Sequence, residues 1–238
     1  MNTLFSNIAE AIESIQSRIA SAAARAGRQI SEIELIAVSK TQPLEAIREA
    51  RDCGLRLFGE NKVQEARAKV ADAPSDLRWH LIGHLQSNKI RHALPLFEMI
   101  HSVDSMELAA QINRIAEEMG LFPKILLEVN VAGESSKFGF QPDVLRKQIE
   151  AIMAFPRLQI DGLMTIAPYN ENAELSRPFF KQLRKLRDDL TLEHNSPLAH
   201  LSMGMSGDFE VAIEEGATLV RVGTAIFGAR NYSKNKSD

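Results

Sequence analysis

The chain has 238 residues, of which 45% are hydrophobic and 25% charged, the balance of a globular protein rather than of a disordered or fibrous one. Its 28 basic and 31 acidic side chains give a formal net charge of -3 with no long run of one sign, which argues against a nucleic-acid partner. A single cysteine, Cys53, excludes an intramolecular disulfide, and no stretch is apolar enough to cross a membrane, so we expect a cytoplasmic protein.

The first 27 residues predict an amphipathic helix. Apolar side chains recur three or four residues apart, at Leu4, Ile8, Ile12, Ile15 and Ile19, and mostly polar residues stand between them. This stripe lacks the continuous apolar core of a signal peptide. We therefore expect an extra helix at the amino terminus of the fold, and no export.

Eight β-rich segments then alternate with helical patterns. They span residues 34–40, 56–61, 78–85, 98–104, 124–131, 158–167, 200–206 and 218–227. Every segment except the last is followed by a helical pattern, such as the one that begins at Pro43 and ends at Gly54. Strands joined by crossover helices run parallel, so this order predicts an α/β fold, a single (β/α)8 TIM barrel over residues 1–230 with a flexible tail at 231–238. An open doubly wound sheet is the alternative, but the glycine-rich loop typical of its dinucleotide-binding members is absent.

Small and polar residues gather after the last two predicted strands. Ser206 and Gly207 precede a helical run, whose free backbone N–H groups favour an anion. Gly223 allows close approach of a ligand, and Thr224 adds a hydroxyl. Each segment alone is typical of a helix cap or a turn. Because phosphate sites recur after strands seven and eight of TIM barrels, their joint placement favours phosphate.

Two cations belong to the same predicted face of the barrel. Arg221 lies within an apolar strand, where a guanidinium needs an acceptor, either a carboxylate such as Glu128 or a ligand. Lys40 ends the first predicted strand. A lysine in this position is normally solvated, but beside a phosphate site and a buried arginine part of it would be the free amine that forms an imine with an aldehyde.

His80 and His84 stand four residues apart on the third predicted strand. That spacing places both on one face but well separated, and no cluster of other ligands completes a metal site, so we expect no metal. His84 either lines the pocket or is a hydrogen-bonded residue at its rim.

At this point the sequence resembles a known family. The segments AVSKTQP, FGENKVQEA, WHLIGHLQSNK, GLMTIAP and LSMGMSGDFEVAIEEGATLVRVGTAIFGAR are similar to those of the YggS/PROSC family of pyridoxal phosphate homeostasis proteins. The resemblance implies a fold-type III barrel related to the amino-terminal domain of alanine racemase, with pyridoxal 5′-phosphate (PLP) as cofactor. The residues that match the cofactor positions are Lys40, Asn61, His84, Met164, Ser206, Gly207, Arg221, Gly223 and Thr224.

The resemblance also implies a role for each of these residues. Lys40 forms the Schiff base with PLP, and Arg221 faces the pyridine nitrogen. The phosphate falls to Ser206, Gly207, Gly223 and Thr224. The residues expected around the ring are Asn61, His84 and Met164.

The implied function is to hold PLP and to buffer or supply it, with apo-enzymes that use PLP as possible partners. An arginine opposite the pyridine nitrogen leaves that nitrogen unprotonated, and the racemase domain that carries a second catalytic tyrosine has no counterpart here. We therefore expect no robust catalysis and a monomer. The alternatives are a minimal amino-acid racemase with Lys40 as its base, and a Schiff-base aldolase. Lys137 is interpreted either as a second amine that relays PLP or as a solvated loop lysine.

Overall fold

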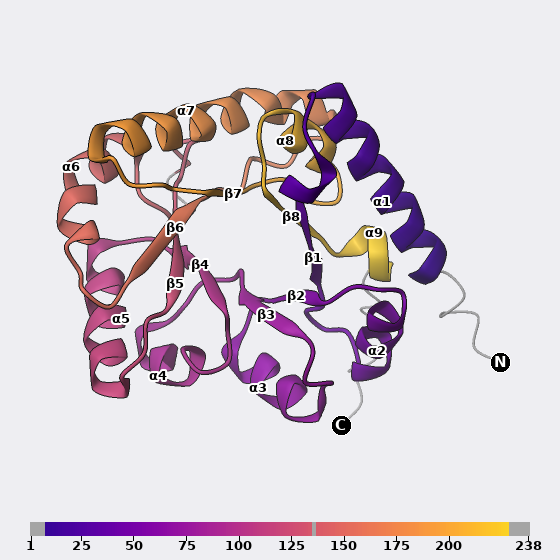
Figure 1. The fold of residues 1–238 in the computed structure, drawn as a ribbon, viewed down its shortest axis with the longest axis horizontal. Helices are drawn as coiled ribbons and strands as arrows, with labels where there is room; N and C mark the ends of the chain where they lie inside the picture. Colours follow the sequence, from indigo (N-terminus) through magenta and orange to yellow (C-terminus); the bar gives the residue numbers. More distant parts are fainter. Residues whose placement is uncertain (1–7, 135–136, 229–238) are drawn as a thin grey trace.

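The computed structural model describes residues 8–134 and 137–228. Eight strands pair in the order β1 to β8 and close into a barrel, in which every pairing is parallel (Figure 1). The strands are β1 (Glu34–Val38), β2 (Leu57–Glu60), β3 (Arg78–Leu81), β4 (Met99–Val103), β5 (Lys124–Glu128), β6 (Gln159–Met164), β7 (His200–Ser202) and β8 (Leu219–Val222). The predicted (β/α)8 barrel is confirmed.

Helices surround the barrel and connect its strands. They are α1 (Ile8–Arg25), α2 (Leu44–Asp52), α3 (Val63–Asp72), α4 (Ile90–Ala93), α5 (Met106–Met119), α6 (Pro142–Met153), α7 (Arg177–His194), α8 (Phe209–Glu214) and α9 (Thr224–Phe227), with short 3-10 turns at Ile30–Glu32, Ser87–Lys89 and Ala173–Ser176. Local sequence sets their ends. The side chain of Ser105 caps α5 by accepting from the Leu108 N–H, and Gly120 ends it with a φ of 68°. In the described residues no helix is long and apolar enough to span a membrane.

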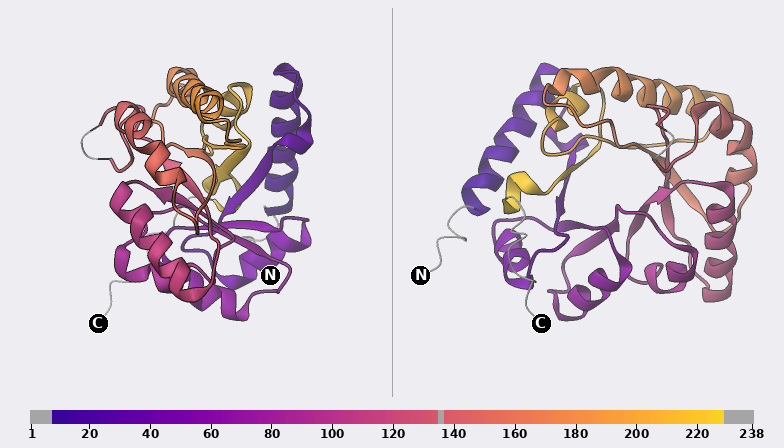
Figure 2. Two further views of the ribbon diagram at one scale, coloured as in Figure 1. Left: turned by 60° about the vertical axis from the view of Figure 1, so that its left-hand side comes forward. Right: turned by 180° about the vertical axis from the view of Figure 1, so that it is seen from behind.

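The amino-terminal helix α1 is confirmed as an addition to the barrel. It lies along the outside next to α8 and α9 (Figure 2). Its buried face includes Ile8, Ile12, Ile15 and Ile19, and full burial of each such side chain contributes roughly 1.5–3 kcal/mol. Arg18 adds an ion pair to Glu210 on α8. Residues 1–7 of the predicted helix and the predicted tail at 231–238 lie outside the described residues.

The strands are shorter than predicted at their carboxyl ends. β1 ends at Val38, so Lys40 lies in the loop two residues beyond the strand. The segment 218–227 is a strand only to Val222, and Thr224–Phe227 form the helix α9. A short apolar run does not by itself distinguish a strand from a buried helical turn, and the Ile226 side chain is buried from α9. The eighth strand is therefore followed by a helix, contrary to the sequence prediction.

The barrel interior holds a layer of apolar side chains and, beside it, a group of buried polar side chains. The apolar layer consists of Ile36, Leu57, Met99, Leu126, Met164 and Leu219. Side chains of His80, His101, Ser202 and Arg221 are buried with them. Because TIM barrels normally fill this space with branched apolar side chains, the polar residues need a particular explanation.

Candidate functional site

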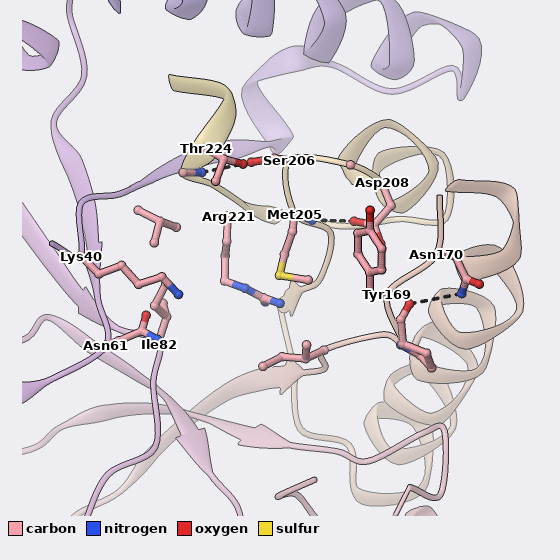
Figure 3. Close-up of a pocket in the computed structure, with 15 residues that line it drawn as sticks. Lys40, Asn61, Ile82, Tyr169, Asn170, Met205, Ser206, Asp208, Arg221 and Thr224 are labelled. Atoms are coloured by element: carbon pink, nitrogen blue, oxygen red, sulfur yellow. Dashed lines mark hydrogen bonds between the residues drawn. The ribbon is translucent and has the colours of Figure 1, made fainter. Parts of the chain in front are cut away.

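A cavity of about 320 Å³ opens at the carboxyl ends of the strands (Figure 3). All but two of the predicted site residues line it, and they come from the loops after β1, β2 and β7 and from β8 with its following turn. The predicted residues that line the cavity are Lys40, Asn61, Ser206, Gly207, Arg221, Gly223 and Thr224. Seven of the nine residues predicted from sequence therefore meet at one cavity.

Lys40 and Arg221 enter the cavity from adjacent parts of the barrel, Lys40 from the loop after β1 and Arg221 from β8. β1 pairs with β8, with Ile36 opposite Arg221, and this pairing closes the barrel. Figure 3 shows both side chains directed into the same space. Two cationic groups therefore face one cavity, which makes it suited to an anionic ligand.

Arg221 is buried, with 4% of its surface exposed, and its position is fixed by two acceptors. Its Nη1 donates to Ser202 Oγ at 2.6 Å and its Nη2 to the Thr165 carbonyl oxygen at 2.8 Å. Burial lowers the pKa of Arg221 to about 10, against the opposing charges of Glu128 and Asp208, so the guanidinium remains protonated at neutral pH. Within the described residues, Arg221 forms no ion pair with Glu128, the carboxylate considered from the sequence. Its acceptors are instead the hydroxyl of Ser202 and the backbone carbonyl of Thr165.

Hydroxyls and backbone N–H groups lie together at the other side of the cavity. Ser206 Oγ accepts long hydrogen bonds from the N–H groups of Gly223 and Ala225, at 3.3 and 3.4 Å. A side chain at Gly223 would bring a Cβ to 3.2 Å from Val38, a close contact that glycine avoids. With the Thr224 hydroxyl, these donors form a set that suits a phosphate group.

His84 and Met164 are the two predicted site residues that do not line the cavity. The His84 ring stacks on Phe138 at 4.0 Å between centroids, and its Nδ1 is 3.2 Å from a carboxylate oxygen of Asp104. Met164 lies in the apolar layer inside the barrel with 1% exposure. The structure therefore places His84 at the rim, the second of its two interpretations, and Met164 below the cavity.

Other lining residues were not among the predicted site residues. Tyr169 and Asn170 follow β6, and Asp208 accepts from the Met205 N–H at 2.7 Å. Tyr169 is 87% exposed and also lines the cavity. The position of this loop directly after a strand was the signal that could have identified it.

Lys137 lies outside this cavity. Its Nζ is 2.7 Å from Glu134 Oε1. It lines a neighbouring cavity of about 170 Å³ together with Glu128 and Asn130.

A chain of hydrogen bonds leads from Arg221 into the barrel interior. Ser202 Oγ is 2.9 Å from His101 Nδ1, and His101 Nε2 is 2.9 Å from His80 Nδ1. Because arginine can only donate, Ser202 Oγ accepts from Arg221, and its hydroxyl is available to donate to His101 Nδ1. With that tautomer of His101, the Nε2–H donates to His80 Nδ1. Burial lowers the pKa of both histidines, that of His80 to about 3, so both rings are neutral.

The two histidines of the third predicted strand, His80 and His84, make separate contacts in the structure. His80 points into the barrel and contacts a histidine of β4, whereas His84 lies at the rim. Within residues 8–134 and 137–228, no group of three or more His, Cys, Asp or Glu side chains is arranged to hold a metal ion.

Comparisons with known proteins agree with this geometry. The family model of the alanine racemase N-terminal domain matches residues 11–231. The pyridoxal phosphate homeostasis protein of Aquifex aeolicus is 48% identical over 227 residues, which cover 95% of this chain and 100% of that protein. The solved structure of PipY from Synechococcus elongatus without PLP is 43% identical with a TM-score of 0.84, and covers 93% of this chain and 100% of PipY. PipY with PLP bound is 45% identical with a TM-score of 0.78, over 90% of this chain and 100% of that one. The chain therefore belongs to the YggS/PROSC family of pyridoxal phosphate homeostasis proteins, which is built on the alanine racemase N-terminal domain.

Proposed function

We propose that this protein binds PLP reversibly at Lys40 and serves PLP homeostasis, holding the cofactor and supplying it to apo-enzymes. One observation carries the proposal: Lys40 and Arg221 line the same cavity as the hydrogen-bond donors of Ser206, Gly223 and Thr224. The relatives that span the whole chain are pyridoxal phosphate homeostasis proteins, and PipY has been solved with PLP bound.

The residues present fit three of the polar groups of PLP: the phosphate, the ring nitrogen and the aldehyde. The donors around Ser206 suit its phosphate, and Arg221 supplies an N–H donor for its ring nitrogen. The cavity volume of about 320 Å³ lies at the lower end of the range for small-molecule sites. When bound, PLP supplies an aldehyde carbon that joins a primary amine through a carbon–nitrogen double bond with loss of one water. Lys40 is the amine that lines the cavity.

Arg221 is the residue that favours holding over catalysis. It is fixed by Ser202 and Thr165 and stays charged, because its pKa of about 10 lies well above neutral pH. A guanidinium only donates hydrogen bonds, so it favours the unprotonated form of the ring nitrogen. A carboxylate in its place would accept a hydrogen bond and favour the protonated form. The site therefore lacks the group that strengthens PLP as an electron sink.

A minimal amino-acid racemase is the second candidate, and one observation favours it. Tyr169 lines the cavity and carries a hydroxyl that could move a proton on the side away from Lys40. This side chain is 87% exposed, however, and water around it would compete for any proton it holds. We therefore place this activity second.

Transfer of PLP to an apo-enzyme in the presence of a trap for free PLP tests the proposal. The protein is loaded with PLP, and its ability to activate the apo-enzyme is compared with that of the same amount of free PLP. We expect activation to persist with the loaded protein and to be abolished with free PLP, and Lys40→Ala, which cannot be covalently loaded, to behave like free PLP. Equal suppression of both sources by the trap would contradict supply of the cofactor. Rapid turnover of an amino acid by the loaded protein would favour the racemase instead.

A further inference from the structure

The loop that carries Lys40 is held by a partly buried ionic cluster that does not line the cavity. The cluster consists of Ser39, Glu60, Glu65 and Lys69, and we call it the Lys69 cluster. Lys69 Nζ donates to the Ser39 carbonyl oxygen at 2.7 Å, to Glu60 Oε1 at 2.8 Å and to Glu65 Oε1 at 2.7 Å. An ammonium has three donors, so each of them is used. The Lys69 side chain is only 11% exposed.

The cluster reaches both neighbours of Lys40 in the chain. On one side, Ser39 donates its hydroxyl to Glu60 Oε1 at 2.7 Å, and its N–H pairs with the Gly59 carbonyl at 3.0 Å. On the other side, the Thr41 N–H donates to Glu65 Oε1. Because Lys69 binds both carboxylates, a single ammonium ties together the two ends of the segment that contains Lys40.

The conformation held in this way is an unfavourable one. Thr41 has a φ of 64°, in the left-handed region that residues other than Gly, Asn and Asp rarely adopt. The Thr41 N–H bond to Glu65 is made from this conformation. The turn directly after Lys40 is therefore set by its contacts rather than by local preference.

The cluster is also poorly explained as a contribution to stability. Glu60 is fully buried, and among the described residues its Oε2 has no hydrogen-bond partner. Burial raises the pKa of Glu60 against the lowering effect of Lys69 and Ser39, so desolvation of the carboxylate outweighs the stabilisation of its charge by these two partners. Buried ion pairs of this kind are often no more stabilising than apolar side chains of similar volume. The Lys69 cluster is better explained by its effect on the conformation of the segment 39–41 than by a contribution to stability.

We propose that Lys69 is a positioning residue for PLP capture: through Ser39, Glu60 and Glu65 it fixes the backbone on both sides of Lys40 and so directs the Lys40 amine toward the aldehyde carbon. This inference rests on the proposed function. Loss of Lys69 leaves the phosphate donors around Ser206 intact and frees the segment 39–41. Non-covalent binding therefore persists, while the amine is held less well for bond formation and the covalent share falls.

Two ligands separate these effects. PLP forms the bond to Lys40, and borohydride reduction followed by mass spectrometry measures the fraction of protein that carries it. Pyridoxine 5′-phosphate has a hydroxymethyl group in place of the aldehyde, so it reports binding without bond formation. For Lys69→Met we expect the trapped fraction at subsaturating PLP to fall by about tenfold, with the dissociation constant for pyridoxine 5′-phosphate within about twofold of wild type. Lys69→Arg, which keeps a charged donor, restores part of the trapped fraction.

The matched control is Lys62→Met, which removes an exposed lysine at the start of the same helix and should leave both measurements unchanged. Glu65→Ala is the second variant, because Glu65 is partly exposed and its removal releases the Thr41 N–H with less risk to folding. It should lower the trapped fraction in the same direction as Lys69→Met. If either folded variant traps PLP as well as wild type, or if both ligands weaken equally, the positioning role is overturned. Absence of the adduct in wild type would instead contradict the proposed function.

Discussion

Replacement of Ser202 by alanine tests how the barrel tolerates the buried Arg221. Ser202 is fully buried, and its Oγ accepts from Arg221 Nη1 at 2.6 Å and lies 2.9 Å from His101 Nδ1. Ser202→Ala removes the hydroxyl, so that Arg221 and His101 each lose one hydrogen bond. A hydrogen bond to a charged group contributes about 1.5–3 kcal/mol and a neutral one about 0.5–1.5 kcal/mol, so we expect the free energy of unfolding to fall by about 2–4 kcal/mol. That loss is large beside the total stability of about 5–15 kcal/mol that is typical of such domains.

Ser102→Ala is the matched control for this prediction. Ser102 is also buried, but its hydroxyl makes one neutral hydrogen bond, to the Gly83 carbonyl oxygen at 2.6 Å. Its loss should cost about 1 kcal/mol. Urea unfolding of the PLP-free proteins at pH 7.5 measures all three free energies. If Ser202→Ala is no more destabilising than Ser102→Ala, the guanidinium does not depend on Ser202 and the reasoning is refuted.

Three further substitutions probe the surroundings of the cavity. Burial raises the pKa of Glu128 from 4.5 to about 7, so ionisation of this carboxyl lowers the stability of the fold progressively between pH 4.5 and 7 and by its full amount above pH 7. Glu128→Gln should therefore stabilise the protein by about 3 kcal/mol at pH 8 and by less than about 1 kcal/mol at pH 5. A difference in unfolding free energy that does not change with pH contradicts this. Gly83→Ala would place a Cβ 2.4 Å from the Asn61 carbonyl oxygen, so this variant should displace the loop after β2 and weaken PLP binding in an absorbance titration; unchanged affinity argues against that contact. Tyr169→Phe should leave PLP affinity and transfer unchanged, whereas loss of a measurable racemase activity would favour the second candidate function.

The fold followed from the sequence because local patterns repeat along the chain. The periodicity of apolar residues indicates each strand and the helix that follows it. Parallel strands then bring their carboxyl ends together at one end of the barrel. Lys40, Ser206 and Arg221 stand near those ends, which is why residues far apart in sequence could be placed in one cavity. The ends of β1 and β8 were missed because an apolar run does not reveal where strand pairing stops.

The parts of the site that were missed depend on contacts between distant segments. His84 lies at the rim because Asp104 and Phe138, from two other loops, hold its ring there. The acceptors of Arg221 are similarly remote: Ser202 lies 19 residues away in sequence, on the neighbouring strand, and Thr165 lies 56 residues away, just after β6. No local pattern signals such pairings, and the buried carboxylate first considered for Arg221 was the reasonable choice on charge alone.

The covalent link between PLP and Lys40 is the central claim, and it can be measured directly. The purified protein is loaded with PLP, reduced with borohydride, digested and analysed by mass spectrometry, with Lys40→Ala treated in parallel. The proposed function predicts a pyridoxyl group on the peptide that contains Lys40 in most molecules of the wild-type protein, and its absence from the variant. A wild-type protein without this adduct, or with the label spread equally over other lysines such as Lys137, would contradict it.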